Sequence, residues 1–296
     1  MKAALIRLHI SVFLWGFTGV LGRLITLNEG LLVWWRLCIT VVSLWILFII
    51  RKQVNKIAFK DFLKIASIGT ILSLHWLCFY GSIKYSNVSI ALTCLATSGL
   101  FSAVVEPIFF RRRVDFFELL LGLFALVGIA IIYFSNLKFS VGIYIGLLAS
   151  LLTVLVSVMN KKVVSGYESK TITLYQLTGG FLGLTLLMPF YNYLFPSDNY
   201  LPQPLDWLWL FILSWCCTIL TFVLYISALR KVSAFTINLT LTLEPVYGIL
   251  LAFALYHENK YFSYTFYIGF LLILIAVFIQ MMRIVQQQRK VVVNMI

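Results

Sequence analysis

The chain is poor in charged residues. Asp, Glu, Lys and Arg make up only 11% of its 296 residues, whereas about 25% is usual in a soluble domain. Hydrophobic residues reach 62%, more than a water-soluble fold of this length can bury. The composition therefore excludes an ordinary soluble protein and predicts one that is embedded in a lipid bilayer.

Groups that could carry enzyme chemistry are also scarce. The three histidines and ten acidic residues are scattered, and the five cysteines lie in apolar segments without the spacing of metal ligands. We therefore expect neither a metal site nor disulfides. The sequence contains neither the phosphate-binding motif G-x-x-x-x-G-K-[ST] nor the nucleophile motif G-x-S-x-G. It accordingly predicts no enzyme, no ATP-driven pump and no cofactor.

Long apolar segments dominate what is present. They run for about twenty residues between short polar breaks, which is the length that an α-helix needs to cross a bilayer, and they lack the roughly ten-residue alternation of barrel strands. The sequence predicts ten transmembrane helices, with approximate limits Leu5–Ile25, Leu31–Ile50, Phe62–Ile83, Val88–Phe110, Phe116–Ser135, Val141–Met159, Thr171–Tyr191, Leu208–Leu229, Ser233–Tyr256 and Phe262–Met282.

The basic residues indicate how these helices are oriented. With the N-terminus in the cytoplasm, eighteen of the 23 Lys and Arg residues fall in cytoplasmic segments, four fall in outer loops, and Arg36 lies within a span. Cytoplasmic loops are enriched in Lys and Arg, so we expect a multi-pass protein of the plasma (inner) membrane with both termini inside. The same rule explains the net charge of +13. We therefore expect the lipid bilayer to be the partner of this basic chain and expect no binding of nucleic acid.

An internal repeat underlies the ten spans. A displacement of 147 residues aligns Phe79–Ile132 with Ile226–Ile279 and pairs Lys84 with Lys231 and Thr93 with Thr240. The identities are sparse, and the similar helix spacing of the two halves carries more weight. Because five helices per half is an odd number, the second half enters the membrane from the opposite side, an arrangement typical of secondary transporters. The expected fold is an all-α integral membrane protein of ten transmembrane helices, built as two inverted-topology five-helix repeats.

Several short motifs add a family resemblance. They are Trp15-Gly16, Arg36, the segment Ala91–Leu121 with Gly122 and Gly128, Glu244-Pro245-Val246, His257-Glu258 and Gly269. With these motifs the chain resembles the EamA family of the drug/metabolite transporter superfamily, whose members are ten-helix carriers. The resemblance implies a first EamA-like repeat at residues 1–137, a second at residues 138–285 and a cytoplasmic tail at residues 286–296.

The two halves depart from each other in one respect. The acidic residue expected after the ninth span is Glu258, but its counterpart after the fourth span is Arg111, and Ser98 stands where the second half has Pro245. A mechanism with two symmetric sites is therefore not expected.

Glu244 is the first candidate for a functional residue. A carboxylate in the middle of an apolar span costs on the order of 2.5–3.5 kcal/mol on insertion scales, and Pro245 frees the carbonyl of Leu241 beside it. Glu244 either carries a proton or a cationic substrate group, or it caps that carbonyl. Thr236, Thr240, Glu244 and Gly248 share one narrow helical face, which favours a position beside a cavity.

Arg36 and His75 are the other costly polar residues inside spans. Arg36 binds an anionic substrate group or anchors an outer gate, or it has only a structural partner. His75 is either a proton-exchanging group or a hydrogen-bonded core residue. Glu106, near the cytoplasmic surface and one turn from Arg111, is expected to form a structural ion pair.

Aromatic and neutral polar side chains complete the candidates. Four deep aromatic residues offer rings for stacking on a planar solute, namely Trp15, Trp76, Tyr80 and Trp215. Other polar residues line a pathway or join helices by hydrogen bonds, and these are Ser89, Thr93, Thr97, Asn160, Tyr175, Gln176 and Asn238. Gly16, Gly19 and Gly22 are expected to serve close helix packing.

The sequence as a whole predicts a secondary transporter that exports small organic metabolites, amino-acid-like or other planar or aromatic solutes, by alternating access. A membrane-embedded enzyme, a channel and a lipid translocator stay open as alternatives. The sequence leaves open the substrate, the transport direction, the oligomeric state and whether a proton is the coupling ion.

Overall fold

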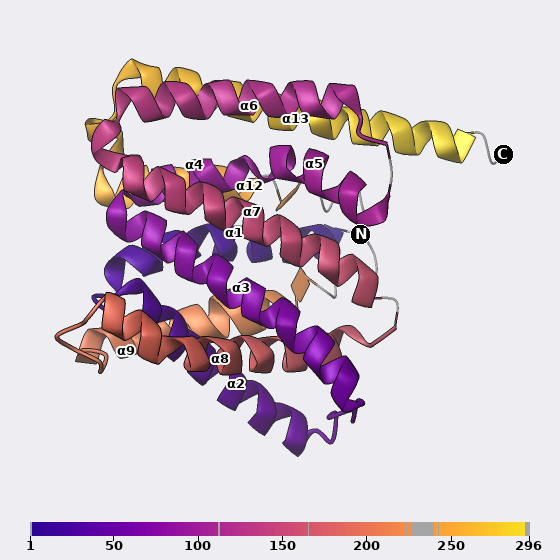
Figure 1. Cartoon of the computed structure of the whole chain (residues 1–296), viewed down its shortest axis with the longest axis vertical. Coiled ribbons are helices and arrows are strands. Elements are labelled where there is room, and N and C mark those ends of the chain that lie inside the picture. Colours follow the sequence, from indigo (N-terminus) through magenta and orange to yellow (C-terminus); the bar gives the residue numbers. More distant parts are fainter. Residues whose placement is uncertain are drawn as a thin grey trace.

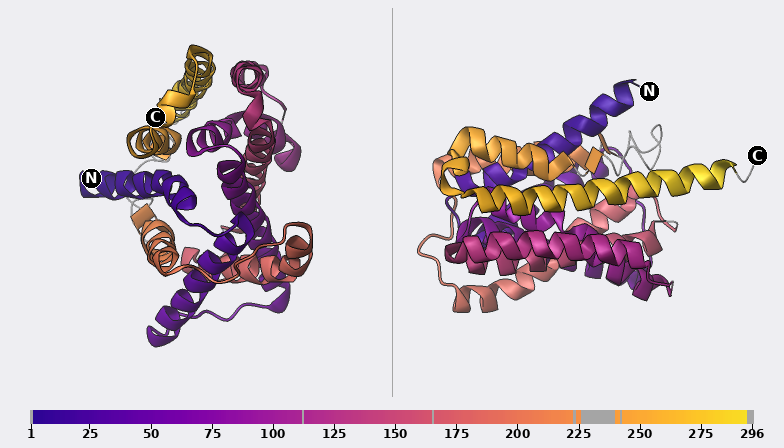
Figure 2. Two further views of the ribbon diagram at one scale, coloured as in Figure 1. Left: turned by 90° about the vertical axis from the view of Figure 1, so that its left-hand side faces the viewer. Right: turned by 90° about the horizontal axis from the view of Figure 1, so that it is seen from above.

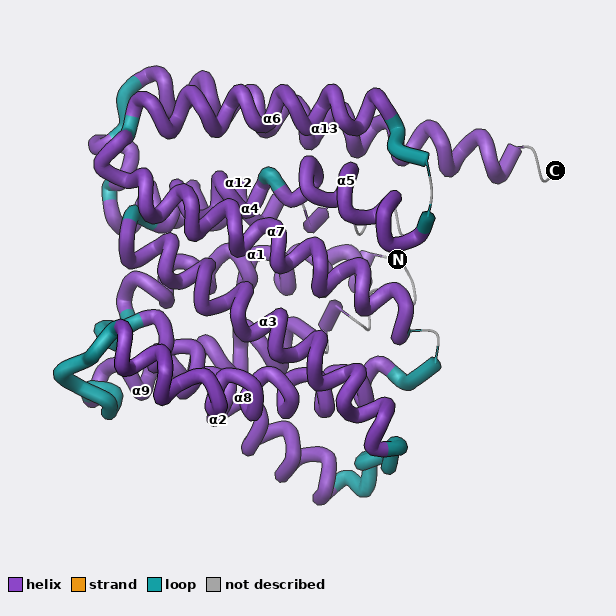
Figure 3. Tube along the Cα trace, in the orientation of Figure 1, coloured by secondary structure: helices purple, strands orange, loops and turns teal. Residues whose placement is uncertain are grey.

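A computed structural model of the chain describes residues 2–111, 113–164, 166–222, 224–225, 240–241 and 243–293. Within these residues the structure is helical and contains no strand (Figure 3). The long helices are α1 (Lys2–Leu24), α2 (Glu29–Ile50), α3 (Phe59–Tyr85), α4 (Val88–Ala96), α5 (Ser98–Phe110), α6 (Phe116–Ser135), α7 (Ser140–Val163), α8 (Ser169–Leu194), α9 (Pro204–Phe211) with its π-helical continuation η2 (Ile212–Leu220), α12 (Leu243–Tyr256) and α13 (Tyr264–Val293).

The helices follow the hydropathy of the sequence. Seven helical segments, covering the first seven expected spans, are long and apolar enough to cross a membrane. Shorter apolar helices at Pro204–Leu220, Leu243–Tyr256 and Tyr264–Gln280 overlap the last three expected spans. Large apolar side chains such as Leu186, Phe134 and Ile50 are exposed on the outside of the bundle, which is the surface that lipid covers.

The fourth expected span is interrupted at Thr97, between α4 and α5. The Thr97 hydroxyl donates to the Cys94 carbonyl (2.6 Å), and the backbone N–H of Thr97 bonds to the same carbonyl (3.1 Å). These i→i−3 bonds replace the regular helical ladder for one turn. The expected span Val88–Phe110 is present with the predicted limits, and the break at Thr97 is a feature that the sequence analysis did not predict.

The bundle has two ends, each with its own set of connections. Helix α1 begins and α13 finishes at the same end, which we call the terminal end (Figures 1 and 2). The α2–α3, α5–α6 and α7–α8 connections lie there, whereas the α1–α2, α3–α4 and α12–α13 connections lie at the other end, called here the opposite end (Figure 1). This placement agrees with the expectation that both termini face one side of the membrane.

Close backbone approaches at glycines hold the helices together. A Cβ built on Gly16 of α1 would lie 2.9 Å from the Glu244 carbonyl oxygen, and one built on Gly248 of α12 would lie 2.9 Å from the Gly16 carbonyl oxygen. Gly128 of α6 and Gly269 of α13 approach each other in the same way. These contacts favour the packing interpretation of the small residues. They also show that Gly248 faces α1 and not a cavity.

Candidate functional site

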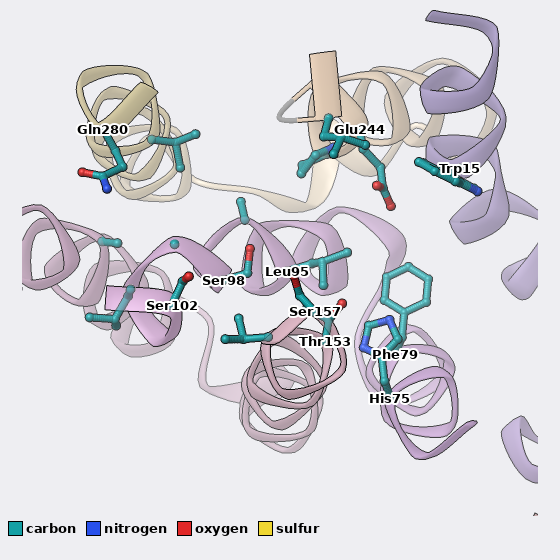
Figure 4. Close-up of a pocket in the computed structure, with 18 of the residues that line it drawn as sticks. Trp15, His75, Phe79, Leu95, Ser98, Ser102, Thr153, Ser157, Glu244 and Gln280 are labelled. Atoms are coloured by element: carbon teal, nitrogen blue, oxygen red, sulfur yellow. The ribbon is translucent and has the colours of Figure 1, made fainter. Parts of the chain in front are cut away.

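A cavity of about 670 Å³ lies among the helices. Trp15 of α1, His75 of α3 and Glu244 of α12 surround its deep part, and hydroxyl groups from α5 and α7 continue along it (Figure 4). Towards the terminal end it is lined by Glu106 and Lys161, whose side chains are partly and largely exposed. The cavity thus runs from the middle of the bundle to the surface at the terminal end.

Arg36 lines this cavity as a buried cation held by neutral partners. Its Nη1 donates to the Tyr80 hydroxyl (2.9 Å), and Nε and Nη2 donate to Thr218 Oγ1 (3.2 and 2.9 Å). The guanidinium carbon lies 3.9 Å from the ring centroid of Trp76, a cation–π contact that suits Arg. Among the described residues no carboxylate pairs with Arg36. The guanidinium therefore remains available to an anionic group in the cavity.

Glu244 is the acidic counterpart of Arg36 in the deep part of the cavity. It lies in the first turn of α12, and its carboxyl group points into the cavity (Figure 4). Within the part of the chain that the structure describes, the carboxyl group forms no hydrogen bond to the Leu241 carbonyl or to any donor. Among the described residues the capping alternative is therefore not observed, and the carboxyl group faces the cavity in which a solute would lie.

His75 faces the cavity from α3. Its Nδ1 lies 2.8 Å from the Ala149 carbonyl, so Nδ1 must carry a hydrogen and, in the neutral ring, Nε2 is an acceptor. The ring stacks on Phe79 at a centroid distance of 6.3 Å. The carbonyl bond fits the interpretation as a core residue, while the free Nε2 leaves room for a role in the cavity.

Two of the expected aromatic residues belong to this site as well. Trp15 and Trp76 line the cavity, and the Trp15 indole N–H donates to Thr221 Oγ1 (3.0 Å). Tyr80 is fully buried behind Arg36 and holds it by a hydrogen bond. Trp215 was expected to lie deep, but it is 52% exposed and faces outwards, bonded to the Ser43 hydroxyl.

Other expected polar residues lie away from the cavity. Thr97 is bonded within the α4–α5 break and to the Ser150 hydroxyl (3.4 Å). The Tyr175 hydroxyl donates to the Asn55 carbonyl (2.9 Å), near the α2–α3 connection. The Gln176 backbone packs against Gly69, where α8 crosses α3. Asn238 lies outside the described residues.

Two pairs of hydroxyl groups in the cavity, beside that of Thr18, were not expected from the sequence. They are Ser98 and Ser102 on α5 and Thr153 and Ser157 on α7 (Figure 4). Both pairs are spaced four residues apart, so each lies on one helical face. That spacing is the signal that could have identified them.

At the mouth of the cavity Glu106 does form an ion pair, but with a different partner from the one expected. Lys161 Nζ lies 2.8 Å from Glu106 Oε1, so the pair joins α5 to α7 instead of linking Glu106 to Arg111 one turn away.

Comparison with known proteins gives the class of this fold and site. The model of the EamA-like transporter family matches residues 2–134 and again residues 140–282. The chain therefore belongs to the EamA-like transporter family and is a membrane transporter made of two such repeats.

Two known proteins are similar to this chain. An uncharacterized transporter of Haemophilus influenzae is 25% identical over 268 residues, which cover 86% of this chain and 83% of that protein. A protein of known crystal structure, 14% identical, matches with a TM-score of 0.59 over 93% of this chain and 95% of its own. The second likeness concerns the fold alone.

Proposed function

We propose that the protein is a secondary transporter of the inner membrane that exports small amphoteric metabolites, amino-acid-like or with a planar or aromatic body, by alternating access. The observation that carries this proposal is one cavity lined by two opposite charges, Arg36 and Glu244, neither of which has a charged partner among the described residues. A substrate carboxylate would pair with Arg36 and an ammonium group with Glu244.

The walls between the two charges suit a flat apolar body. Trp15, Trp76, Phe79 and Phe222 contribute rings to the cavity, and aromatic rings offer large stacking areas at little conformational cost. The hydroxyls of α5 and α7 add hydrogen-bond partners along the route to the terminal end. A membrane-embedded enzyme is less well supported, because the described residues hold no group of three His, Cys, Asp or Glu that could bind a metal ion.

The proposed topology is ten transmembrane helices in two inverted five-helix repeats, residues 1–137 and 138–285, followed by a cytoplasmic tail. We place the terminal end in the cytoplasm because the α2–α3, α5–α6 and α7–α8 connections lie there (Figure 1). The segments at these connections carry basic residues such as Arg51, Arg113 and Lys161, as the distribution of Lys and Arg in membrane proteins favours for the cytoplasmic side. The cavity then faces the cytoplasm in this structure. An exporter is expected to bind its substrate on the cytoplasmic side, which this orientation of the cavity allows.

A thermal-shift screen of the purified transporter tests the substrate class. A ligand of the folded state stabilises it by mass action, so aromatic amino acids should raise the apparent Tm. The matched amides, such as phenylalaninamide beside phenylalanine, lack the anion and should not. Arg36→Lys keeps the charge but loses the planar guanidinium that bonds to Tyr80 and Thr218. We expect this variant to bind the amino acid at least about tenfold more weakly, which is about 1.4 kcal/mol of binding free energy.

Transport by the screening hit is then measured in proteoliposomes. Saturable counterflow that unlabelled substrate inhibits is expected of a carrier. Non-saturable flux would instead indicate a channel, and equal stabilisation by acid and amide would remove Arg36 as the anion site.

A further inference from the structure

The opposite end of the bundle is closed by a buried carboxylate that joins the two halves of the chain. Glu258, in the short helix η3 (Glu258–Tyr261) between α12 and α13, is fully buried. Its Oε2 accepts hydrogen bonds from the backbone N–H and hydroxyl of Ser89 (2.9 and 2.6 Å), and Oε1 accepts one from the N–H of Val88 (3.2 Å). Oε1 also forms an ion pair with the guanidinium of Arg23.

These contacts tie three elements together. Val88 and Ser89 lie in the first turn of α4, whose free N–H groups favour an anion, and Arg23 lies in the last turn of α1. The Arg23 guanidinium in turn lies 4.3 Å from the Tyr256 ring centroid at the end of α12, and the Tyr256 hydroxyl donates to the Val20 carbonyl (2.8 Å). The second half of the chain is thereby fastened to the first at this end.

The cavity does not reach this closed end. Its described lining residues include neither Arg23 nor Glu258. Opening the cavity here would separate Glu258 from Arg23, Val88 and Ser89, and would break one ion pair and three charge-assisted hydrogen bonds. The contacts around Glu258 therefore act against opening at the opposite end.

The terminal end has weaker ion pairs. The pair between Glu106 and Lys161 has side chains that are 34% and 51% exposed, and the pair between Asp115 and Arg283 has side chains that are 35% and 25% exposed. Exposed pairs of this kind contribute little. Moreover, they join α5 to α7 and α6 to α13, and so do not bridge the mouth towards α1.

The 147-residue displacement shows what stands in the place of Glu258 at the terminal end. Glu258 corresponds to Arg111. A cation thus occupies the position where the opposite end has its buried acid. Arg111 cannot accept the hydrogen bonds and the ion pair that the carboxylate of Glu258 accepts.

We propose that Glu258 and Arg23 form a latch on the outer entrance of the cavity, and that the lack of an equivalent acid at the inner end makes the cytoplasm-facing state the resting state of the transporter. The proposal rests on the orientation and alternating access proposed above. It assigns Glu258 a role in access to the cavity without contact with substrate.

Access to the cavity can be measured with a single cysteine. The five native cysteines are replaced by serine or alanine, since Cys217 lines the cavity, and Ser98→Cys is added as the reporter. A membrane-impermeant charged maleimide is applied to intact cells for the outer side and to inside-out vesicles for the inner side. With the latch intact, labelling should be fast from inside and slow from outside.

Glu258→Gln and Arg23→Gln should each raise the rate of labelling from outside by about tenfold, because each removes the ion pair and shifts the equilibrium between the two states. Arg283→Gln removes an ion pair at the terminal end and serves as the matched control, with no rise expected. Arg23 is 37% exposed on its side chain, so Arg23→Gln decides the question should Glu258→Gln fail to fold.

The proposal is overturned if outside labelling stays unchanged in the folded variants, or if the latch-intact protein is labelled fast from outside. Labelling requires no substrate. A negative result would therefore leave the counterflow test of the transport function intact, and a failed counterflow test would leave the latch measurement valid.

Discussion

Buried charge is the feature of single residues that the sequence reveals best. Arg36 and Glu244 stand out because an ionisable side chain inside an apolar span is costly unless it has a purpose. The structure places both on one cavity, together with His75, Trp15 and Trp76. Their roles in binding and coupling stay predictions. The sequence identified each of them separately, and the structure brings them to one cavity.

Hydroxyl groups were less predictable. Ser and Thr are inexpensive inside a helix because the hydroxyl can bond to a carbonyl of the preceding turn, as Thr178 does with the Leu174 carbonyl (2.7 Å). Such a residue gives no sign of whether it faces a cavity, a neighbouring helix or lipid. Ser98 and Ser157 were missed for this reason, and Tyr175 was included although it packs near the α2–α3 connection.

Glu244→Gln tests whether Glu244 exchanges a proton during transport. The amide preserves the volume and hydrogen bonding of the side chain but cannot titrate. We expect uptake driven by a pH gradient to be lost, while counterflow, which need not move a proton, survives in the same proteoliposomes. Gradient-driven uptake at the wild-type rate would exclude Glu244 as the coupling residue and leave His75 as the next candidate.

At the scale of helices, hydropathy predicted where the helices lie but not the break between α4 and α5 inside one span. The limits of α2, α6 and α7 follow from apolar runs bounded by polar residues, and Asn28 and Asp115 cap α2 and α6 through side-chain bonds to backbone N–H groups. The break at Thr97 depends on a local hydroxyl–carbonyl bond. A window of about twenty residues averages over such a bond and cannot show it.

Two glycine substitutions test the packing of α6 against α13. A Cβ on Gly128 would lie 2.6 Å from the Gly269 carbonyl oxygen, whereas nothing lies within 4 Å of a Cβ on Gly99 in α5. Gly128→Ala should destabilise the fold by about 1–3 kcal/mol, as overpacking does, and lower the apparent Tm of the purified protein. Gly99→Ala is the matched control and should not. If both variants lowered the apparent Tm equally, the close approach of α6 and α13 at Gly128 would not explain the loss of stability.

At the scale of the whole molecule, the sequence predicted on which side the termini lie better than it predicted which helices pack together. The distribution of Lys and Arg in the loops predicted both termini on one side, and α1 and α13 do have their ends together (Figure 2). The sequence did not predict that α6 and α13 would pair with each other, as Figure 1 shows. Both helices are apolar around most of their surface, and periodicity cannot select a partner for such a helix.

The asymmetry between the two ends can be tested by giving the inner end the acid that it lacks. Arg111→Glu places a carboxylate where the displacement of 147 residues puts the counterpart of Glu258. We expect the cytoplasm-closed state to gain population, so that a Ser98→Cys reporter is labelled more slowly from inside and faster from outside. Arg111→Gln removes the cation without adding an acid and should change neither rate much. If Arg111→Gln had the same effect as Arg111→Glu, loss of positive charge would be the cause, and the missing carboxylate could not explain why the resting transporter faces the cytoplasm.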